Sequence, residues 1–126
     1  SADTTQADLR QALLEGIALS AADVVTAMHA HVPIGGSIAI DGGLARSRYF
    51  AQFLADMIGR DVVVAEFDER TAFGTAKLAA LGAGIELPEP PTRTHTFRPR
   101  TADSTETRKR FHDAVSRCKG WRDLRE

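Results

Sequence analysis

The sequence has little that would tie it to an oxidising compartment, a membrane or nucleic acid. Its 126 residues include one cysteine, Cys118, which excludes an internal disulfide and favours a reducing compartment. No apolar run approaches the ~20 residues that span a bilayer, and no signal-like apolar segment opens the chain. A net charge of -1 gives no overall attraction for polyanions. We therefore expect a cytoplasmic chain with neither a membrane nor nucleic acid as its partner.

The common catalytic and metal-binding patterns are also missing. The chain has neither a G-x-G-x-x-G fingerprint nor a P-loop with its Lys-Ser/Thr. Ser47 has no histidine in the order of a catalytic triad, and the pair His29 and His31 has no further metal ligands in view. Three acidic residues at an expected helix start are read as stabilising the helix dipole: Glu66, Asp68 and Glu69. We expect no catalytic residue and no metal ligand in this stretch.

Apolar periodicity predicts alternating helices and strands. The expected helices cover about residues 8–28, 46–58, 71–81 and a last one from 103 or 104, and the expected strands cover 37–40 and 61–67. The buried stripe of the first helix is expected at Leu13, Ile17, Ala21, Val24 and Met28. In the last helix, Cys118 falls on the apolar stripe and is expected in the core. Small residues of the third helix would let it approach a neighbouring element closely.

Prolines interrupt this pattern after the third helix. Pro88, Pro90 and Pro91 exclude regular structure there, and residues 92–100 are expected to be extended and exposed. Basic residues gather between Arg93 and Arg110, where they could meet phosphate or could form a solvated loop and helix face. Beyond them, Gly120 is expected to end the last helix and Trp121 to pack back.

The predicted order, α-β-α-β-α with a terminal helix, implies an α/β fold with parallel strands. Two strands make a poor sheet, since parallel sheets have several members and are covered on both faces. Either this is an unusually small domain, or further strands belong to sequence outside this chain. We favour the second interpretation.

The turn from Asp41 to Ser47 is the best candidate for a ligand site. Gly42 and Gly43 permit positive φ and leave no Cβ, so a ligand can approach the backbone. They follow the carboxyl end of a predicted parallel strand, where ligands bind in open α/β sheets, and precede a helix N-terminus. The alternative is a turn that only connects a strand to a helix.

The run from Ser37 to Gly84 is similar to the C-terminal domain of the FGGY carbohydrate kinases. The matching parts are a strand ending in Asp-Gly-Gly, the run from Gln52 to Asp56, and "ERTAFGTAKLAALGAG" after a valine strand. Upstream, "RQALLEGIALSAADVV" resembles the family's helix before this strand. Downstream, "FRP" and "RKRFHDAVSRCKGW" resemble the end of the glycerol-kinase branch.

The resemblance implies a partial ribonuclease-H-like domain of the actin-like ATPase type, without its first β-hairpin strands. It implies a subdomain over residues 1–85, a Pro/Arg-rich loop over 86–102 and a terminal helix over 103–126 that packs on the same domain. It further implies that ATP and Mg²⁺ serve the full-length enzyme and that this part holds the adenosine. The implied contacts are Gly42, Gly43, Leu44 and Ser47, where Ser47 stands at the position of an asparagine in glycerol kinases.

The resemblance also implies what lies elsewhere. The phosphate-binding hairpin, the substrate residues and the general-base aspartate of the family have no counterpart in this chain, so the fragment alone should be inactive. Its implied partners are a small sugar or polyol and the N-terminal domain of the kinase, and a homo-oligomer is also open. Glycerol is the first expectation for the substrate, with a pentulose or another sugar as the alternative. The competing hypothesis is a stand-alone, non-enzymatic α/β binding or interaction module.

Overall fold

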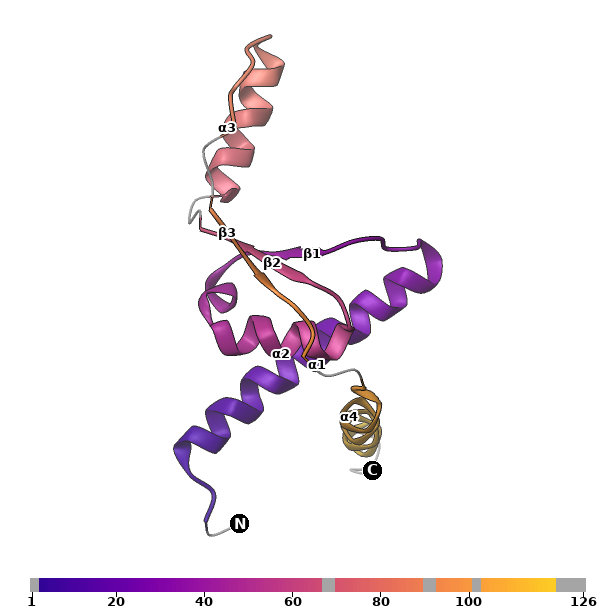
Figure 1. Cartoon of the computed structure of the whole chain (residues 1–126). Helices are drawn as coiled ribbons and strands as arrows, with labels where there is room; N and C mark the ends of the chain where they lie inside the picture. Colours follow the sequence, from indigo (N-terminus) through magenta and orange to yellow (C-terminus); the bar gives the residue numbers. More distant parts are fainter. Residues whose placement is uncertain (1–2, 67–69, 90–92, 101–102, 120–126) are drawn as a thin grey trace, which may run out of the picture.

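The structure, a computed structural model, describes residues 3–66, 70–89, 93–100 and 103–119. Its elements alternate between helix and strand as the sequence predicts, and the α/β class is confirmed (Figure 1). They are α1 (Gln6–His31), β1 (Ile38–Ile40), the 3₁₀ helix η1 (Gly43–Arg46), α2 (Arg48–Ile58), β2 (Val62–Ala65), α3 (Arg70–Gly82), β3 (Thr94–Phe97) and α4 (Thr105–Cys118).

The sheet has the order β1-β2-β3. β1 pairs in parallel with β2, as predicted, with Ile38 opposite Val62. β3 pairs antiparallel with β2, with Phe97 opposite Val62, a pairing that the sequence did not predict. The expectation of an extended, exposed segment holds for Thr94–Thr96, while Phe97 is half-buried because it lies on the face of the sheet that packs against the core.

The core lies between α1, α2 and one face of the sheet. α2 supplies much of it, with Phe50 and Leu54 buried toward the sheet and α1. Ala18 and Ala22 of α1 are fully buried beside Ala51 of α2, so the two helices approach closely. α2 begins after a cap at Ser47 and ends at Gly59, whose φ of 64° is the left-handed conformation that glycine adopts readily.

The first helix differs from its prediction in length and in its buried face. It starts with a capping box, since Thr5 Oγ1 accepts a hydrogen bond from Asp8 N and the Asp8 carboxylate accepts one from Thr5 N. It continues to His31 instead of ending near Met28, and His29 Nδ1 accepts a hydrogen bond from Ile34 N (2.9 Å) beyond its end. Its buried residues are Ala18, Leu19 and Ala22, whereas four members of the stripe expected to be buried are exposed: Leu13, Ile17, Val24 and Met28.

The same helix is long and apolar. Among the described residues, α1 alone has the length and composition that crossing a membrane would require, which the search for an apolar run did not anticipate. A core helix of a folded domain meets the same criterion, and α1 packs along α2.

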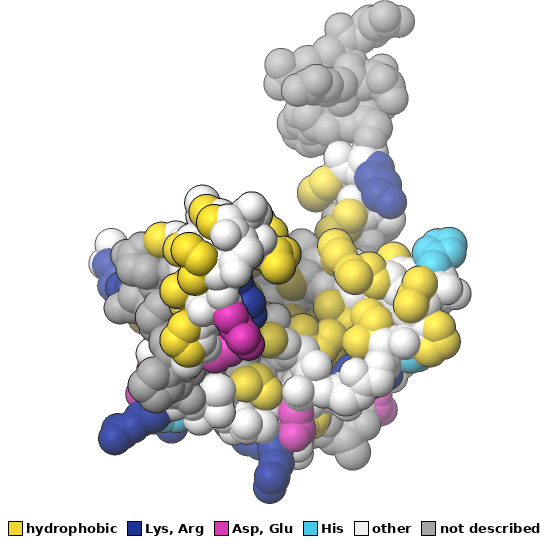
Figure 2. Space-filling view, turned by 90° about the horizontal axis from the view of Figure 1, so that it is seen from above, with side chains coloured by type: hydrophobic (Ala, Val, Ile, Leu, Met, Phe, Trp, Pro, Cys, Tyr) yellow, Lys and Arg dark blue, Asp and Glu magenta, His cyan; other side chains and the backbone are white. Residues whose placement is uncertain are grey.

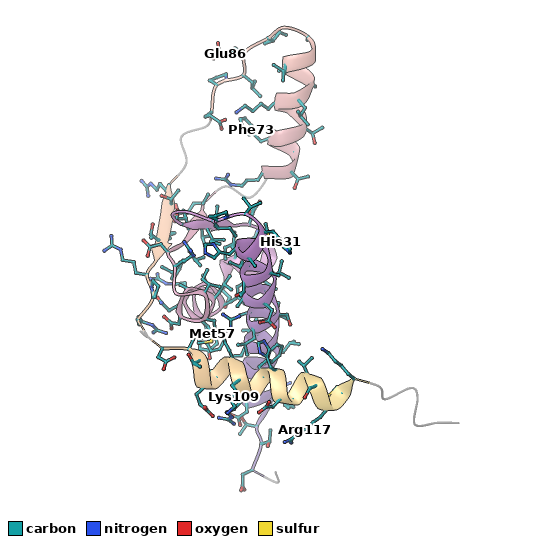
Figure 3. The ribbon with its side chains drawn as sticks, turned by 90° about the vertical axis from the view of Figure 1, so that its right-hand side faces the viewer. His31, Met57, Phe73, Glu86, Lys109 and Arg117 are labelled. Atoms are coloured by element: carbon teal, nitrogen blue, oxygen red, sulfur yellow. The ribbon has the colours of Figure 1, made fainter. Side chains whose placement is uncertain are left out.

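α3 and α4 lie at opposite ends of the molecule (Figures 1 and 3). α3, with Phe73, and the returning segment, with Glu86, project from the body, and no described residue of α3 is buried. The close approach expected of its small residues is therefore not formed. α4, with Lys109 and Arg117, crosses near α1, and Phe111 packs against the core. Cys118 is exposed, so its expected place in the core was wrong; the residues by which α4 is joined to the rest of the molecule lie earlier in the helix, at Arg108, Phe111 and His112. Gly120 and Trp121 lie outside the described residues.

A buried carboxylate fixes the chain after β3 to α2. Asp56 is 5% exposed, and its Oδ1 accepts hydrogen bonds from Arg100 N (2.8 Å) and Gln52 Nε2 (3.0 Å). Its Oδ2 accepts from the Arg100 guanidinium at 2.7 Å. Burial acts to raise the pKa of Asp56, but the hydrogen bonds from Arg100 and Gln52 outweigh it and hold the pKa below its usual value. We call this set the Asp56 clamp.

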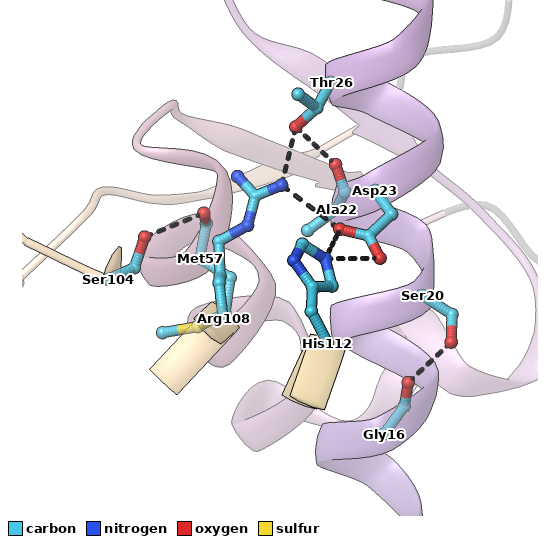
Figure 4. A network of polar contacts seen from close by, with 9 residues as sticks. All are labelled: Gly16, Ser20, Ala22, Asp23, Thr26, Met57, Ser104, Arg108 and His112. Atoms are coloured by element: carbon cyan, nitrogen blue, oxygen red, sulfur yellow. Dashed lines mark hydrogen bonds and ion pairs between the residues drawn. The ribbon is translucent and has the colours of Figure 1, made fainter. Parts of the chain in front are cut away.

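A second carboxylate fixes α4 to α1 (Figure 4). Asp23 Oδ1 accepts hydrogen bonds from Arg108 Nη2 (3.2 Å) and from His112 Nε2 (2.8 Å). Arg108 also donates to Thr26 Oγ1 at 2.9 Å. Burial acts to raise the pKa of Asp23, and the bonds from His112 and Arg108 lower it further than burial raises it. We call this set the Asp23 clamp.

Candidate functional site

The turn from Asp41 to Ser47 leads from β1 into α2 through η1. Gly42 has φ 93° and ψ −178°, a conformation open essentially to glycine alone. Its carbonyl accepts a hydrogen bond from Ala45 N (3.0 Å), and Leu44 O accepts one from Ser47 N (3.0 Å). Ala45 is buried beneath the turn, while Leu44 is 41% exposed. The turn is thus a fixed backbone loop with an accessible outer surface.

The two glycines serve different purposes. Gly42 is required by its backbone conformation, whereas Gly43 has no positive φ. A Cβ built on Gly43 would meet nothing within 4 Å, so the space above it is open. Gly43 and Leu44 begin η1, and their N–H groups therefore have no acceptor inside that short helix. The open space and the two N–H groups let a ligand contact the main chain here.

Ser47 has a structural role that the sequence analysis missed. It is the N-cap of α2, where its Oγ accepts a hydrogen bond from Phe50 N (3.2 Å). The signal was present, because serine before an apolar helical run is a common cap. The hydroxyl still has one proton to donate. The helix expected from about residue 46 begins at Arg48, and η1 lies between it and the glycines, so the α2 N-terminus does not adjoin Gly43.

A hollow lies beside the turn at the carboxyl ends of the parallel strands. A small recess of about 100 Å³ over the glycines shares four lining residues with a groove of about 490 Å³. The shared residues are Ala45, Arg46, Val64 and Ala65. The groove has an apolar floor that includes Phe97, and Arg48 lies on its rim. Its volume is in the range of pockets that hold small ligands.

A pair of polar side chains, one from β3 and one just after β2, also lines the groove. His95 Nε2 and Glu66 Oε1 are 2.5 Å apart, and both side chains are about half exposed. β3 brings His95 there through the pairing that the sequence analysis did not predict. Of the acidic cluster read as a helix start, Glu66 therefore pairs with His95, while Asp68 and Glu69 lie outside the described residues.

Other candidates contribute nothing to this site. His29 and His31 lie in the last turn of α1, and within the described residues no group of three histidine, cysteine or acidic side chains could hold a metal. Arg100 and Arg108 of the basic run bind Asp56 and Asp23 inside the molecule. These two arginines of the basic run therefore bind carboxylates of the same chain.

A match to a protein-family model identifies the family of the chain. Residues 1–83 match the model described as "FGGY family of carbohydrate kinases, C-terminal domain". The chain belongs to this family. The Gly-Gly turn, the strand pair and the first three α-helices of the FGGY domain lie within the matched residues.

In sequence, this FGGY chain is similar to glycerol kinases. It is 34% identical over 129 residues to a glycerol kinase of Koribacter versatilis, with 95% of this chain and 26% of that protein covered. It is 37% identical over 127 residues to a glycerol kinase of Bordetella parapertussis, with 94% and 25% covered. The chain therefore spans about a quarter of the length of these relatives.

Solved structures agree with the fold. The FGGY chain superposes on the Plasmodium falciparum glycerol kinase with ADP at a TM-score of 0.70 and 26% identity, covering 93% of this chain and 25% of that one. It superposes on the xylulose kinase from Rhodospirillum rubrum at 0.65 and 29% identity, covering 94% and 25%. The actin-like ATPase fold expected from the sequence is in keeping with both neighbours.

Proposed function

We propose that this chain is the adenosine-holding C-terminal part of an ATP-dependent polyol or sugar kinase, with glycerol as its first substrate candidate. The observation that carries the proposal is the open space above Gly43, at the carboxyl ends of parallel strands, in a chain of the FGGY family. The neighbouring structure solved with ADP supports the choice of an adenine nucleotide. A pentulose remains the alternative substrate, since the second structural neighbour is a xylulose kinase.

The turn offers three kinds of contact to adenosine. The N–H groups of Gly43 and Leu44 can donate to ring or ribose acceptors, and the exposed Leu44 side chain can cover a flat base. Ser47 can donate its hydroxyl proton to a base nitrogen while its oxygen continues to cap α2. Gly42 holds the loop in shape and touches the ligand only through main chain.

The remaining chemistry belongs to residues beyond this chain. Transfer of the γ-phosphoryl group needs a carboxylate that takes the hydroxyl proton and Mg²⁺ that offsets phosphate charge. Among the described residues, no group of three or more histidine, cysteine or acidic side chains could hold a metal. We propose that the chain is a partial ribonuclease-H-like domain that supplies nucleotide contacts in a cytoplasmic kinase and is inactive alone.

Substitution of Gly43 tests the adenosine seat. In the longer gene product, Gly43→Val should raise the KM for ATP at least about tenfold, because the new side chain fills the space intended for adenosine. The KM for the acceptor alcohol and the circular dichroism spectrum should stay unchanged. The matched control is Gly35→Val, since Gly35 also lacks a positive φ and has nothing within 4 Å of an added Cβ.

Two results would contradict the proposal. Equal KM values for ATP in Gly43→Val and Gly35→Val would remove the turn from the nucleotide site. A reading frame that encodes nothing beyond this chain would favour the stand-alone binding module. A panel of glycerol, tetritols and pentuloses then identifies the substrate.

A further inference from the structure

The recess over the glycines is too small to hold a whole nucleoside. It measures about 100 Å³, well below the roughly 300–1,000 Å³ of pockets that hold small ligands. A nucleoside that contacts Gly43 therefore extends beyond the recess. The groove of about 490 Å³ shares Ala45, Arg46, Val64 and Ala65 with the recess, so it is the space into which the ligand can extend.

The lining of the groove suits the base of the nucleotide better than its ribose. Val64 and Phe97 give it apolar surface, and Arg46 and Arg48 line it as well. A flat aromatic base packs on apolar side chains, and guanidinium groups stack on aromatic faces. The ribose hydroxyls can instead bind the main-chain N–H groups at the start of η1. We therefore place the base in the groove and the ribose at the turn.

The groove differs from other apolar surface by its polar pair. Hydrophobic side chains gather on the surface in several groups when the molecule is seen from above, so apolar lining does not by itself mark a ligand site (Figure 2). The alternation of β2, continued by one residue, puts Glu66 on the same face as Val64, and the register of β3 puts His95 there too. Among the described residues that line the groove, Glu66 has the one carboxylate.

Glu66 is fixed at the groove and keeps one oxygen for a ligand. Its N–H donates to Arg93 O (2.8 Å), which holds its backbone beside the segment that enters β3. Its Oε1 pairs with His95 Nε2 at 2.5 Å. A carboxylate accepts hydrogen bonds on both oxygens, and the described part of the chain provides no donor to Oε2. Because the side chain is about half exposed, a ligand in the groove can reach this oxygen.

We propose that Glu66, positioned by His95, binds the 6-position of the purine and makes the kinase select adenine over guanine and hypoxanthine. The proposal rests on the proposed function. Adenine has an amino group at this position, which donates, whereas guanine has a carbonyl oxygen, which accepts. An ionised carboxylate only accepts, so Oε2 can take a hydrogen bond from adenine and faces a second acceptor when guanine is bound. Selection therefore comes from one matched pair and one repulsive pair.

A change of nucleotide tests the proposal, first without any substitution. In the longer gene product, kcat/KM should be at least about tenfold higher for ATP than for inosine triphosphate, which has a carbonyl in place of the 6-amino group. Glu66→Gln should lower this ratio toward one, because an amide donates as well as accepts. The matched control is Glu89→Gln, since Glu89 is an exposed glutamate that pairs with Lys77 and does not line the groove.

Two results would overturn the proposal. One is equal kcat/KM for ATP and inosine triphosphate in the unmodified protein. The other is an ATP-to-inosine-triphosphate ratio that is the same in Glu66→Gln as in Glu89→Gln.

Substitution of His95 tests its positioning role. His95→Leu removes the ring nitrogen that pairs with Glu66 and should lower the nucleotide ratio. His95→Gln keeps an N–H donor and should restore most of the ratio. If the pair only stabilises the fold, both variants lower the melting temperature and leave the ratio unchanged, which would contradict the positioning role.

Gly43→Val separates this proposal from the proposed function. If Gly43→Val raises the KM for ATP while Glu66→Gln leaves the nucleotide ratio unchanged, the turn holds adenosine and Glu66 does not select the base. If the ratio depends on Glu66 while Gly43→Val and Gly35→Val have equal KM values for ATP, the base lies in the groove and the adenosine seat at the turn is wrong.

Discussion

The two carboxylate clamps do the same task in different surroundings. The Asp56 clamp fixes the chain after β3 to α2, and the Asp23 clamp fixes α4 to α1. The Asp56 side chain is 6% exposed and has its partners on both oxygens, whereas that of Asp23 is 37% exposed. The chemistry is alike, since each carboxylate binds an arginine and has a lowered pKa. The burial of the two carboxylates differs, and we expect this difference to determine how much each clamp contributes to the stability of the fold.

Burial matters because a charge that is removed from water and left without a partner destabilises the folded protein. Asp56 cannot turn to water when its partners are removed, so its hydrogen bonds are obligatory. Asp23 can be hydrated on its open side, so its pairs resemble surface ion pairs of small net value. We therefore expect the segment after β3 to be held firmly and α4 to be held loosely.

Removal of the Asp56 carboxylate should have the largest effect on stability. Asp56→Ala should lower the free energy of unfolding by about 2–3 kcal/mol, because the hydrogen bonds that Arg100 and Gln52 donate to this buried carboxylate are lost. Urea denaturation followed by circular dichroism measures it. A loss no greater than that of Asp23→Ala would show that burial does not separate the clamps.

The second-largest expected effect is a loss of stability at acidic pH, where the Asp56 carboxylate becomes protonated. A carboxylate whose pKa is lowered by folding stabilises the protein above its unfolded pKa of about 3.9, and this contribution is lost as the pH falls through the lower folded value. The parent chain should therefore lose more stability between pH 6 and pH 3 than Asp56→Asn does. Urea midpoints at the two pH values measure the difference, and identical losses would contradict the assignment of a lowered pKa to this group.

The Asp23 clamp should give the smallest effect. Asp23→Ala should cost about 0.5–1 kcal/mol, and the cost should shrink as salt is raised, because the pair with Arg108 and His112 is partly solvated. Denaturation at low and at high salt tests this. Arg117→Ala is the control, since Arg117 lies on the same helix but in neither clamp. If the free energy of unfolding lost in Asp23→Ala does not depend on salt, α4 is held by packing and not by the ion pairs of Asp23.

Local sequence signals predicted much of the fold. Thr5 and Gly59 mark helix ends by chemistry that needs no tertiary contact, and the valines of β2 predicted its strand. The turn at Gly42 was also predictable, because a positive φ selects glycine. β3 was not, since its pairing depends on a neighbour about thirty residues earlier.

The sequence by itself determined the α-β-α-β-α order as far as α3, the parallel pair and a glycine turn at its carboxyl end. The tertiary structure decided which apolar stripe of α1 is buried and that the space above Gly43 is open. The physical reason is that periodicity reports how apolar a face is and not what lies against it. α1 is apolar on two faces, and only the position of α2 distinguishes the buried face from the exposed one.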